Sequence, residues 1–80
     1  MDIDSIKPDM VLDARGLSCP MPLLKTKKTI GSMSSGQILE IQGTDPGSRN
    51  DLPAWCERSG HTFLGDKEDA GFFRFYIQAG

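Results

Sequence analysis

The sequence contains only two cysteines, Cys19 and Cys56, and one histidine, His61, in its 80 residues. Two cysteines this far apart do not supply the disulfide framework of a small secreted domain, and they do not form the Cys-x-x-Cys pair of a thioredoxin-like site. One histidine beside two distant cysteines also lacks the spacing of a zinc site. We therefore expect two reduced thiols, with no metal and no bound cofactor.

Long apolar runs are also absent. No stretch approaches the roughly 20 apolar residues that a membrane-spanning helix needs. The N-terminus, residues 1–4, has neither a basic start nor an apolar run that would indicate a signal peptide. These features predict a cytoplasmic protein that does not interact with membranes.

The chain lacks a strong excess of charge of either sign, because nine basic residues stand against eleven acidic ones and the formal net charge is −2. Such a chain has no global positive field, so nonspecific DNA binding is not expected. The sign is uneven along the chain, and residues 15–49 carry a basic excess. The basic residues of this segment are expected to dock or steer an acidic partner: Arg15, Lys25, Lys27, Lys28 and Arg49.

The length and composition are those of one small folded domain. The 80 residues are 38% hydrophobic and 25% charged, which fits a globular protein better than a disordered one. A chain this short leaves no room for a second domain. We expect a single domain over residues 1–80, with an ordered core at about 9–79.

The first half of the chain predicts a strand, a helix and a second strand. Residues 10–14 alternate like a strand, and Gly16 provides the turn after it. Pro20 suits the first position of a helix, and residues 37–42 form the next β-rich run. The helix has one stripe of residues at helical spacing, with the lysine contributing its stem: Leu23, Lys27, Ile30 and Met33. Two strands joined through a helix are expected to be parallel.

The second half predicts a helix and a hairpin. Four residues share one helical face after the turn at 45–48: Leu52, Trp55, Cys56 and Ser59. Gly60 ends this helix, but Pro53 conflicts with Ser48 as its N-cap, so the helix either begins near Asp51 or bends. Residues 61–64 and 72–78 are predicted strands joined by a charged loop at 66–71.

The element order is therefore β-α-β-α-β-β. In the last strand Phe73, Phe75 and Ile77 share one face. The other face is expected to be more polar and carries Phe72, Arg74, Tyr76 and Gln78. We predict an α/β fold: a two-layer α/β sandwich with a four-stranded mixed sheet and two helices on one face.

The segment with the densest chemistry runs from Gly16 to Pro22, because it places Cys19 at the N-cap of the first helix. The positive end of the helix dipole and the unpaired N–H groups there favour a thiolate, which predicts a lowered pKa and a nucleophilic sulfur. With Pro20 and Pro22 at the first and third helical positions, the N–H of Met21 is left to stabilise the sulfur. The alternative from spacing alone is that Cys19 is simply a small buried residue.

The remaining candidates are weaker. Cys56 shares a helical face with Leu52 and Trp55, so it is expected to pack in the core rather than react. His61 is left without an assigned role. Asp13 and Asp45 are expected to shape the turns around the thiol, without forming an acid/base pair.

The string from Leu12 to Leu23, LDARGLSCPMPL, with its Cys-Pro-x-Pro motif, resembles the TusA/SirA family of small sulfur-carrier proteins. The resemblance continues through Asp45-Pro46-Gly47-Ser48, Asp51-Leu52-Pro53 and Trp55-Cys56 to the last aromatic strand, over residues 10–78. It implies the same sandwich fold. It also implies that Cys19 carries sulfane sulfur as a persulfide, a sulfurtransferase activity of the carrier type.

The family resemblance also implies partners. The expected donor is a cysteine desulfurase or a rhodanese-like protein, and the expected acceptor is a DsrE- or TusBCD-like protein or another protein thiol. Family members serve thiolation of the tRNA wobble uridine, dissimilatory sulfur oxidation or molybdenum-cofactor routes, and the sequence does not choose among them. Two alternatives stay open: a regulatory or RNA-binding module that uses the basic segment 15–49, and a redox protein that pairs Cys19 with Cys56.

Overall fold

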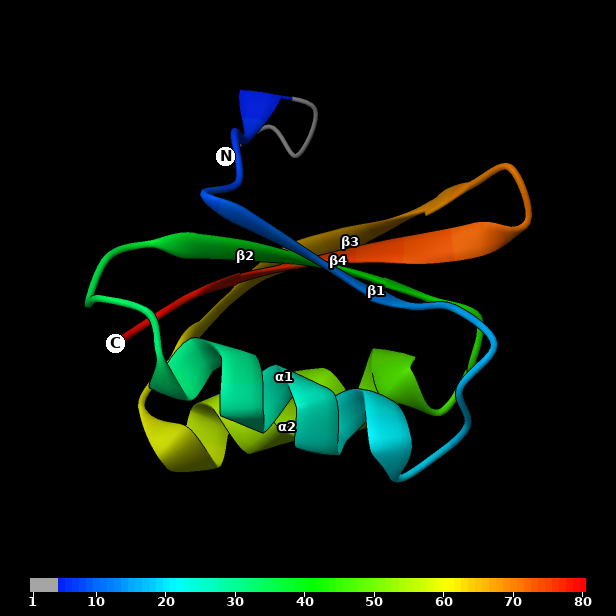
Figure 1. The fold of residues 1–80 in the computed structure, drawn as a ribbon, viewed down its shortest axis with the longest axis horizontal. Coiled ribbons are helices and arrows are strands. Elements are labelled where there is room, and N and C mark those ends of the chain that lie inside the picture. Colours follow the sequence, from blue (N-terminus) through cyan, green and yellow to red (C-terminus); the bar gives the residue numbers. More distant parts are fainter. Residues whose placement is uncertain (1–4) are drawn as a thin grey trace.

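Two helices cover one face of a four-stranded sheet in the computed structural model, and within residues 5–80 no α-helix lies on the opposite face (Figure 1). The structure describes residues 5–80, so residues 1–4, where we noted the absence of a signal peptide, lie outside the described residues. The elements in chain order are β1 (Met10–Ala14), α1 (Met21–Gly31), β2 (Ile38–Gly43), α2 (Ser48–Ser59), β3 (Thr62–Asp69) and β4 (Phe72–Gln78). The predicted two-layer α/β sandwich is confirmed.

The strands lie in the order β1-β2-β4-β3. β1 pairs in parallel with β2, as expected for two strands joined through α1. β4 pairs antiparallel with β2 on one side and with β3 on the other. The sheet is therefore mixed, and β1 and β2 end together at one edge of it.

The core lies between the sheet and the helices. Leu39 and Ile41 of β2 and Phe75 and Ile77 of β4 are fully buried, because alternate residues of these strands point toward the helices. The helices contribute four buried hydrophobic side chains: Ile30, Leu52, Trp55 and Cys56. Burial of this apolar surface is the main force that holds the two layers together.

The buried face of α1 differs from the predicted stripe. Pro22, Thr26 and Ile30 are its buried residues, and Lys27 is exposed. Thr26 is fully buried because its hydroxyl donates a 2.8 Å hydrogen bond to the carbonyl of Pro22. The assignment of Lys27 to the apolar stripe was therefore wrong, since a threonine satisfied by its own helix fills that side.

α2 begins at Ser48, and Pro53 lies inside it. Neither a start near Asp51 nor Ser48 as N-cap is correct, because Gly47 is the N-cap and the amide of Ser48 donates to the carbonyl of Asp45. Burial of the Leu52, Trp55 and Cys56 side of the helix offsets the hydrogen bond that the proline ring removes. The helix ends at Gly60 as expected, with a left-handed φ of 81°.

The hairpin of β3 and β4 is tighter than predicted. β3 extends to Asp69, so most of the expected charged loop over 66–71 pairs with β4, and the turn is Ala70-Gly71. Gly71 has a φ of 89°, which a glycine adopts without strain in a two-residue turn. Charged residues were mistaken for a loop because alternate side chains of β3 lie on the open face of the sheet.

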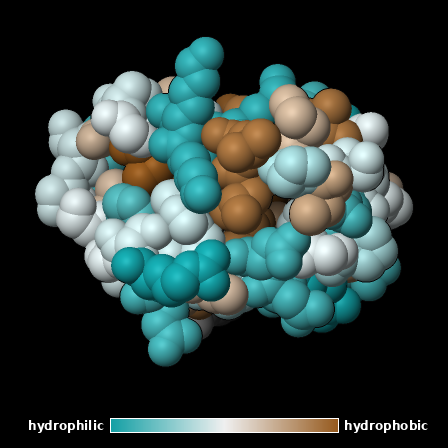
Figure 2. Space-filling model, turned by 90° about the horizontal axis from the view of Figure 1, so that it is seen from below, coloured by the Kyte–Doolittle hydropathy of each residue, from teal (hydrophilic) through white to brown (hydrophobic). Residues whose placement is uncertain are grey.

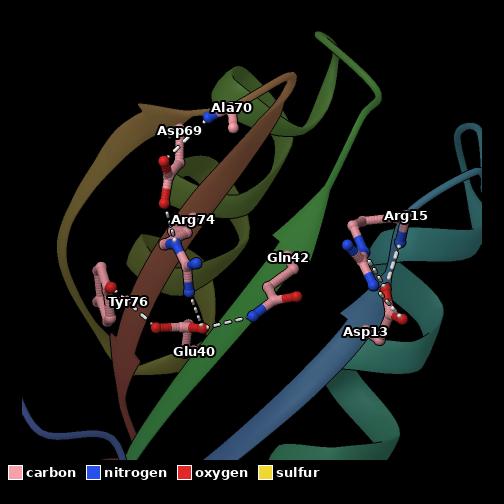
Figure 3. A network of polar contacts seen from close by, with 8 residues as sticks. All are labelled: Asp13, Arg15, Glu40, Gln42, Asp69, Ala70, Arg74 and Tyr76. Atoms are coloured by element: carbon pink, nitrogen blue, oxygen red, sulfur yellow. Dashed lines mark hydrogen bonds and ion pairs between the residues drawn. The ribbon is translucent and has the colours of Figure 1, made fainter.

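The open face carries a network of polar side chains (Figure 3). Arg74 of β4 donates to Asp69 and to Glu40, each at 2.9 Å, and Gln42 of β2 also donates to Glu40. Tyr76 donates to the other oxygen of Glu40 at 2.8 Å. The polar face predicted for β4 is confirmed, although Tyr76 on that face is only 4% exposed.

Candidate functional site

Cys19 lies in the loop that joins β1 to α1, beyond the shared end of the two parallel strands. The loop that joins β2 to α2 leaves the sheet at the same edge, because the carboxyl ends of parallel strands meet there (Figure 1). Crevices at the carboxyl ends of parallel strands are common places for functional residues in α/β folds. The topology therefore brings two loops that are far apart in sequence to one place.

Two hydrogen bonds anchor the Cys19 loop to the β2–α2 loop. The amide of Gly16 donates to the hydroxyl of Thr44 at 2.9 Å, and the amide of Cys19 donates to the carboxylate of Asp45 at 3.0 Å. Gly16 has a φ of 82°, so the turn after β1 uses the conformation that glycine permits. Asp45 thus shapes the backbone around the thiol, as its position in the sequence suggested.

The start of α1 is one residue later than predicted. Pro20 is the N-cap and Met21 the first helical residue, so Cys19 precedes the cap and Pro22 stands at the second position. The amide of Met21 donates to the carbonyl of Ser18 at 2.9 Å. Cys19 as N-cap and the Met21 N–H as a thiolate donor are therefore both incorrect, because the turn before the helix already uses that N–H.

The Cys19 thiol is exposed and faces a carboxylate. Its Sγ donates a hydrogen bond to Oδ2 of Asp51 at 3.5 Å. This hydrogen bond, partial desolvation, and the charges of Asp51 and Asp45 raise the pKa of Cys19 above its ordinary value. The predicted lowering of the pKa is therefore wrong: two carboxylates act on the sulfur and disfavour its anion.

Asp51 is the site residue that the sequence analysis did not single out. It lies in the first turn of α2, 32 residues after Cys19, and is half-buried. The signal was present in the topology, because an acidic residue in the first turn of a helix that follows β2 comes close to the loop that follows β1. Asp45 and Asp51 together form an acidic pair beside the thiol.

The other cysteine is separate from this site. Cys56 is 1% exposed and belongs to the hydrophobic core, as expected from its helical face. Its burial raises the pKa of the thiol to about 11. His61 lies beside Trp55, with ring centroids 5.0 Å apart, and its Nδ1 accepts the amide of Gly80. The burial of Cys56 and the contacts of His61 therefore both fix the C-terminal end of α2 against the rest of the fold.

The candidate docking residues fall into two groups. Arg15 pairs with Asp13 at 2.9 Å (Figure 3), and Arg49 pairs with Asp66 at 3.4 Å. Lys25, Lys27 and Lys28 are exposed on α1, and no ion pair within residues 5–80 uses them. Among the five candidate docking residues, the three lysines are therefore the ones without an ion-pair partner in residues 5–80.

The surface of α1 next to Cys19 also has an apolar component. Met21 and Leu24 are 43% and 48% exposed. On the helical side of the molecule, hydrophobic side chains reach the surface between hydrophilic ones (Figure 2). An exposed thiol is thus followed by a helix that mixes apolar and basic exposed residues.

The described part of the chain contains no helix long and apolar enough to cross a membrane.

Comparison with known proteins identifies the family of the chain. Residues 10–79 match the family described as sulfurtransferase TusA. The chain is 48% identical to YrkI of Bacillus subtilis (strain 168) over 75 residues, which cover 94% of this chain and all of YrkI. It is 47% identical to the sulfur carrier protein TusA of Allochromatium vinosum over 70 residues, which cover 88% of this chain and 92% of that protein.

The fold comparison leads to the same group of proteins. The crystal structure of the SirA-like protein from Desulfitobacterium hafniense superposes with a TM-score of 0.73 at 27% identity. The match covers 89% of this chain and 97% of the other. Since the family match and the identity to TusA each extend over most of the sequence, the chain belongs to the TusA family of sulfur carrier proteins.

Proposed function

We propose that this chain is a sulfur-relay protein that accepts sulfane sulfur on Cys19 as a persulfide and passes it to a thiol of an acceptor protein. The observation that carries the proposal is the contrast between the two cysteines. Cys19 is exposed in a loop held by Thr44 and Asp45, whereas Cys56 is buried in the core. A carrier needs a sulfur that two different proteins can reach in turn.

The chemistry requires no oxidant. The Cys19 thiolate attacks the outer sulfur of a donor persulfide, forming a new S–S bond while the donor S–S bond breaks. The inner sulfur of the donor leaves with the electron pair of that bond as a thiolate. The proton that Cys19 loses when it forms the attacking thiolate balances the proton that the donor thiolate takes up. In the second half of the cycle an acceptor thiolate attacks the outer sulfur of the Cys19 persulfide and regenerates the Cys19 thiolate.

The donor that we propose is a cysteine desulfurase or a rhodanese-like protein, and the acceptor is another protein thiol, such as that of a DsrE- or TusBCD-like protein. The uses that the family resemblance implies are thiolation of the tRNA wobble uridine and dissimilatory sulfur metabolism. The transient persulfide is the only added group in this scheme, and we propose neither a metal nor a cofactor. The relay would operate in the cytoplasm.

Intact mass spectrometry tests the proposal. The purified protein is incubated with a cysteine desulfurase and cysteine, or with a rhodanese and thiosulfate. Each added sulfur increases the mass by about 32 Da, and a reductant removes it. We expect loading of the wild-type protein and of Cys56→Ser, but no loading of Cys19→Ser.

Loading that persists in Cys19→Ser would contradict the assignment of Cys19. If neither donor loads the folded wild-type protein, the relay proposal fails. Salt-dependent RNA binding through residues 15–49 would then be measured as the alternative function.

A further inference from the structure

The contact between Cys19 and Asp51 places a carboxylate against the reacting sulfur. The Sγ and Oδ2 atoms lie 3.5 Å apart, within hydrogen-bonding distance for a thiol donor. Only the protonated thiol can make this bond, because a thiolate has no proton to donate. The contact therefore distinguishes between the two charge states of the sulfur.

Both ends of this contact are held by other parts of the fold. The amide of Cys19 donates to Asp45, which fixes the backbone on the thiol side. Asp51 is anchored by α2, where its amide donates to the carbonyl of Gly47 at 3.0 Å. The following residue, Leu52, is fully buried, which ties this turn of α2 to the core. The sulfur and the carboxylate consequently face each other without a partner protein.

Within residues 5–80, the two charged groups that shift the pKa of Cys19 are both acidic. Asp51 of α2 and Asp45 of the β2–α2 loop both raise the pKa of Cys19. On the β1–α1 loop itself, Arg15 makes its side-chain contacts with Asp13 and with the ring of Phe72. The lysines of α1 are not among the groups that shift the Cys19 pKa. A negative charge on Cys19 Sγ is therefore opposed by Asp51 and Asp45 and is not balanced by a basic side chain among the groups that shift its pKa.

We propose that Asp51 is a positioning residue that keeps the proton on Cys19 Sγ in the free protein and thereby lowers the reactivity of this exposed sulfur toward small electrophiles. The thiolate, not the thiol, reacts with alkylating agents and peroxide, so retention of the proton protects an accessible cysteine. The benefit of this lowered reactivity for sulfur transfer rests on the proposed relay function. A carrier that is unreactive alone loses fewer molecules to oxidation before it meets a donor.

The test is the rate of alkylation of Cys19 by iodoacetamide as a function of pH, with the wild-type protein and Asp51→Asn. We expect the pKa of Cys19 to fall in Asp51→Asn, because the substitution removes a neighbouring negative charge and the acceptor of the thiol hydrogen bond. The thiolate fraction at neutral pH then rises, and although a less basic thiolate is less nucleophilic, the alkylation rate at neutral pH should increase about threefold. Glu57→Gln, which removes an exposed carboxylate from the same helix, should leave the pH profile unchanged.

The proposal is overturned if Asp51→Asn has the wild-type pH profile or a higher Cys19 pKa, or if Glu57→Gln causes the same shift. Asp51→Ser provides a second neutral variant if the asparagine variant does not fold, as judged by circular dichroism. Asp51→Glu keeps the charge and should stay close to the wild type. No donor protein is needed, so failure of this proposal is distinguishable from failure of sulfur loading on Cys19.

Discussion

Glu40 of β2 and Tyr76 of β4 stand directly opposite each other in the sheet, and the Tyr76 hydroxyl donates a 2.8 Å hydrogen bond to Glu40 Oε1. Both residues lie on the face of the sheet opposite α1 and α2, yet they are 5% and 4% exposed. Arg74 and Gln42 occupy the other oxygen of Glu40. The open face of the sheet is thus organised around a buried carboxylate whose two oxygens are both hydrogen-bonded.

Replacement of Tyr76 by phenylalanine tests this pair. Tyr76→Phe keeps the ring but leaves Glu40 Oε1 without its hydroxyl donor, and an unsatisfied buried polar atom costs about 1–3 kcal/mol. We expect the free energy of unfolding to fall by that amount in urea titrations, with little change in the m-value. The fold and sulfur loading should persist.

A double-mutant cycle with Glu40→Gln separates this hydrogen bond from other effects of the ring substitution. Residues in direct contact show coupling energies of about 0.5–3 kcal/mol, so the double variant should lose less stability than the two single variants together. Strict additivity would mean that the Tyr76 hydroxyl does not stabilise the protein through Glu40.

The same carboxylate predicts how stability changes in acid. Burial alone would raise the pKa of Glu40, but hydrogen bonds from Gln42 and Tyr76, together with the charge of Arg74, hold the pKa below its ordinary value. The unfolded chain therefore binds more protons than the folded one as the pH falls, so stability decreases with falling pH. The loss begins near the unfolded pKa of about 4.3 and is complete below the lowered folded pKa.

Urea unfolding between pH 7 and pH 3 measures this effect. Glu40→Gln is less stable at pH 7, but it should lose less stability than the wild type as the pH falls through this window. The carboxylates of Asp13 and Asp69, whose pKa values are also lowered by hydrogen bonds, remain in both proteins. Identical pH slopes for the two proteins would show that Glu40 has no part in the acid response.

Cys56 provides a prediction on stability and reactivity together. The buried thiol, with a pKa of about 11, should resist iodoacetamide in the folded protein while Cys19 reacts. Cys56→Ser buries a hydroxyl without an assigned partner and should lower the free energy of unfolding by about 1–3 kcal/mol. Cys56→Ala provides the comparison, since it removes the thiol without adding a polar group.

Mass spectrometry of the alkylated protein shows which of the two cysteines reacts. A single modification on Cys19 in native buffer, and two after denaturation, is the expected result. Rapid double modification, or a Cys19–Cys56 disulfide under mild oxidation, would instead favour the dithiol redox alternative.

The fold could be predicted from the sequence because its information is local. Alternating residues in 72–78 and the helical spacing of Leu52, Trp55 and Cys56 each identify an element and its buried face. The sequence prediction was wrong where contacts between elements determine which residues are buried or paired. Thr26 replaces Lys27 on the buried side of α1 through its bond to Pro22, and the polar end of β3 is a strand because β4 pairs with it.

The site could be predicted only in part. The Cys-Pro-x-Pro motif identifies Cys19, and the exposed thiol agrees with that assignment. Its electrostatic surroundings come from Asp45 and Asp51, which follow a different strand, so a helix-start argument limited to residues 16–22 gives the wrong direction for the Cys19 pKa. A contact across 32 residues of sequence depends on how the parallel strands pair.

The last prediction concerns the lysines of α1. Arg15 and Arg49 are compensated by Asp13 and Asp66, whereas the α1 lysines form no ion pair with the described residues. We therefore expect these three lysines to provide the electrostatic steering toward an acidic partner: Lys25, Lys27 and Lys28. Changing all three to glutamine should slow sulfur loading by up to about tenfold at low salt, and the difference should fade as salt screens the charges. The matched control is the double variant Arg15→Gln and Arg49→Gln. An equal loss of rate in that control, or a loss that does not depend on salt, would show that steering does not reside in the α1 lysines.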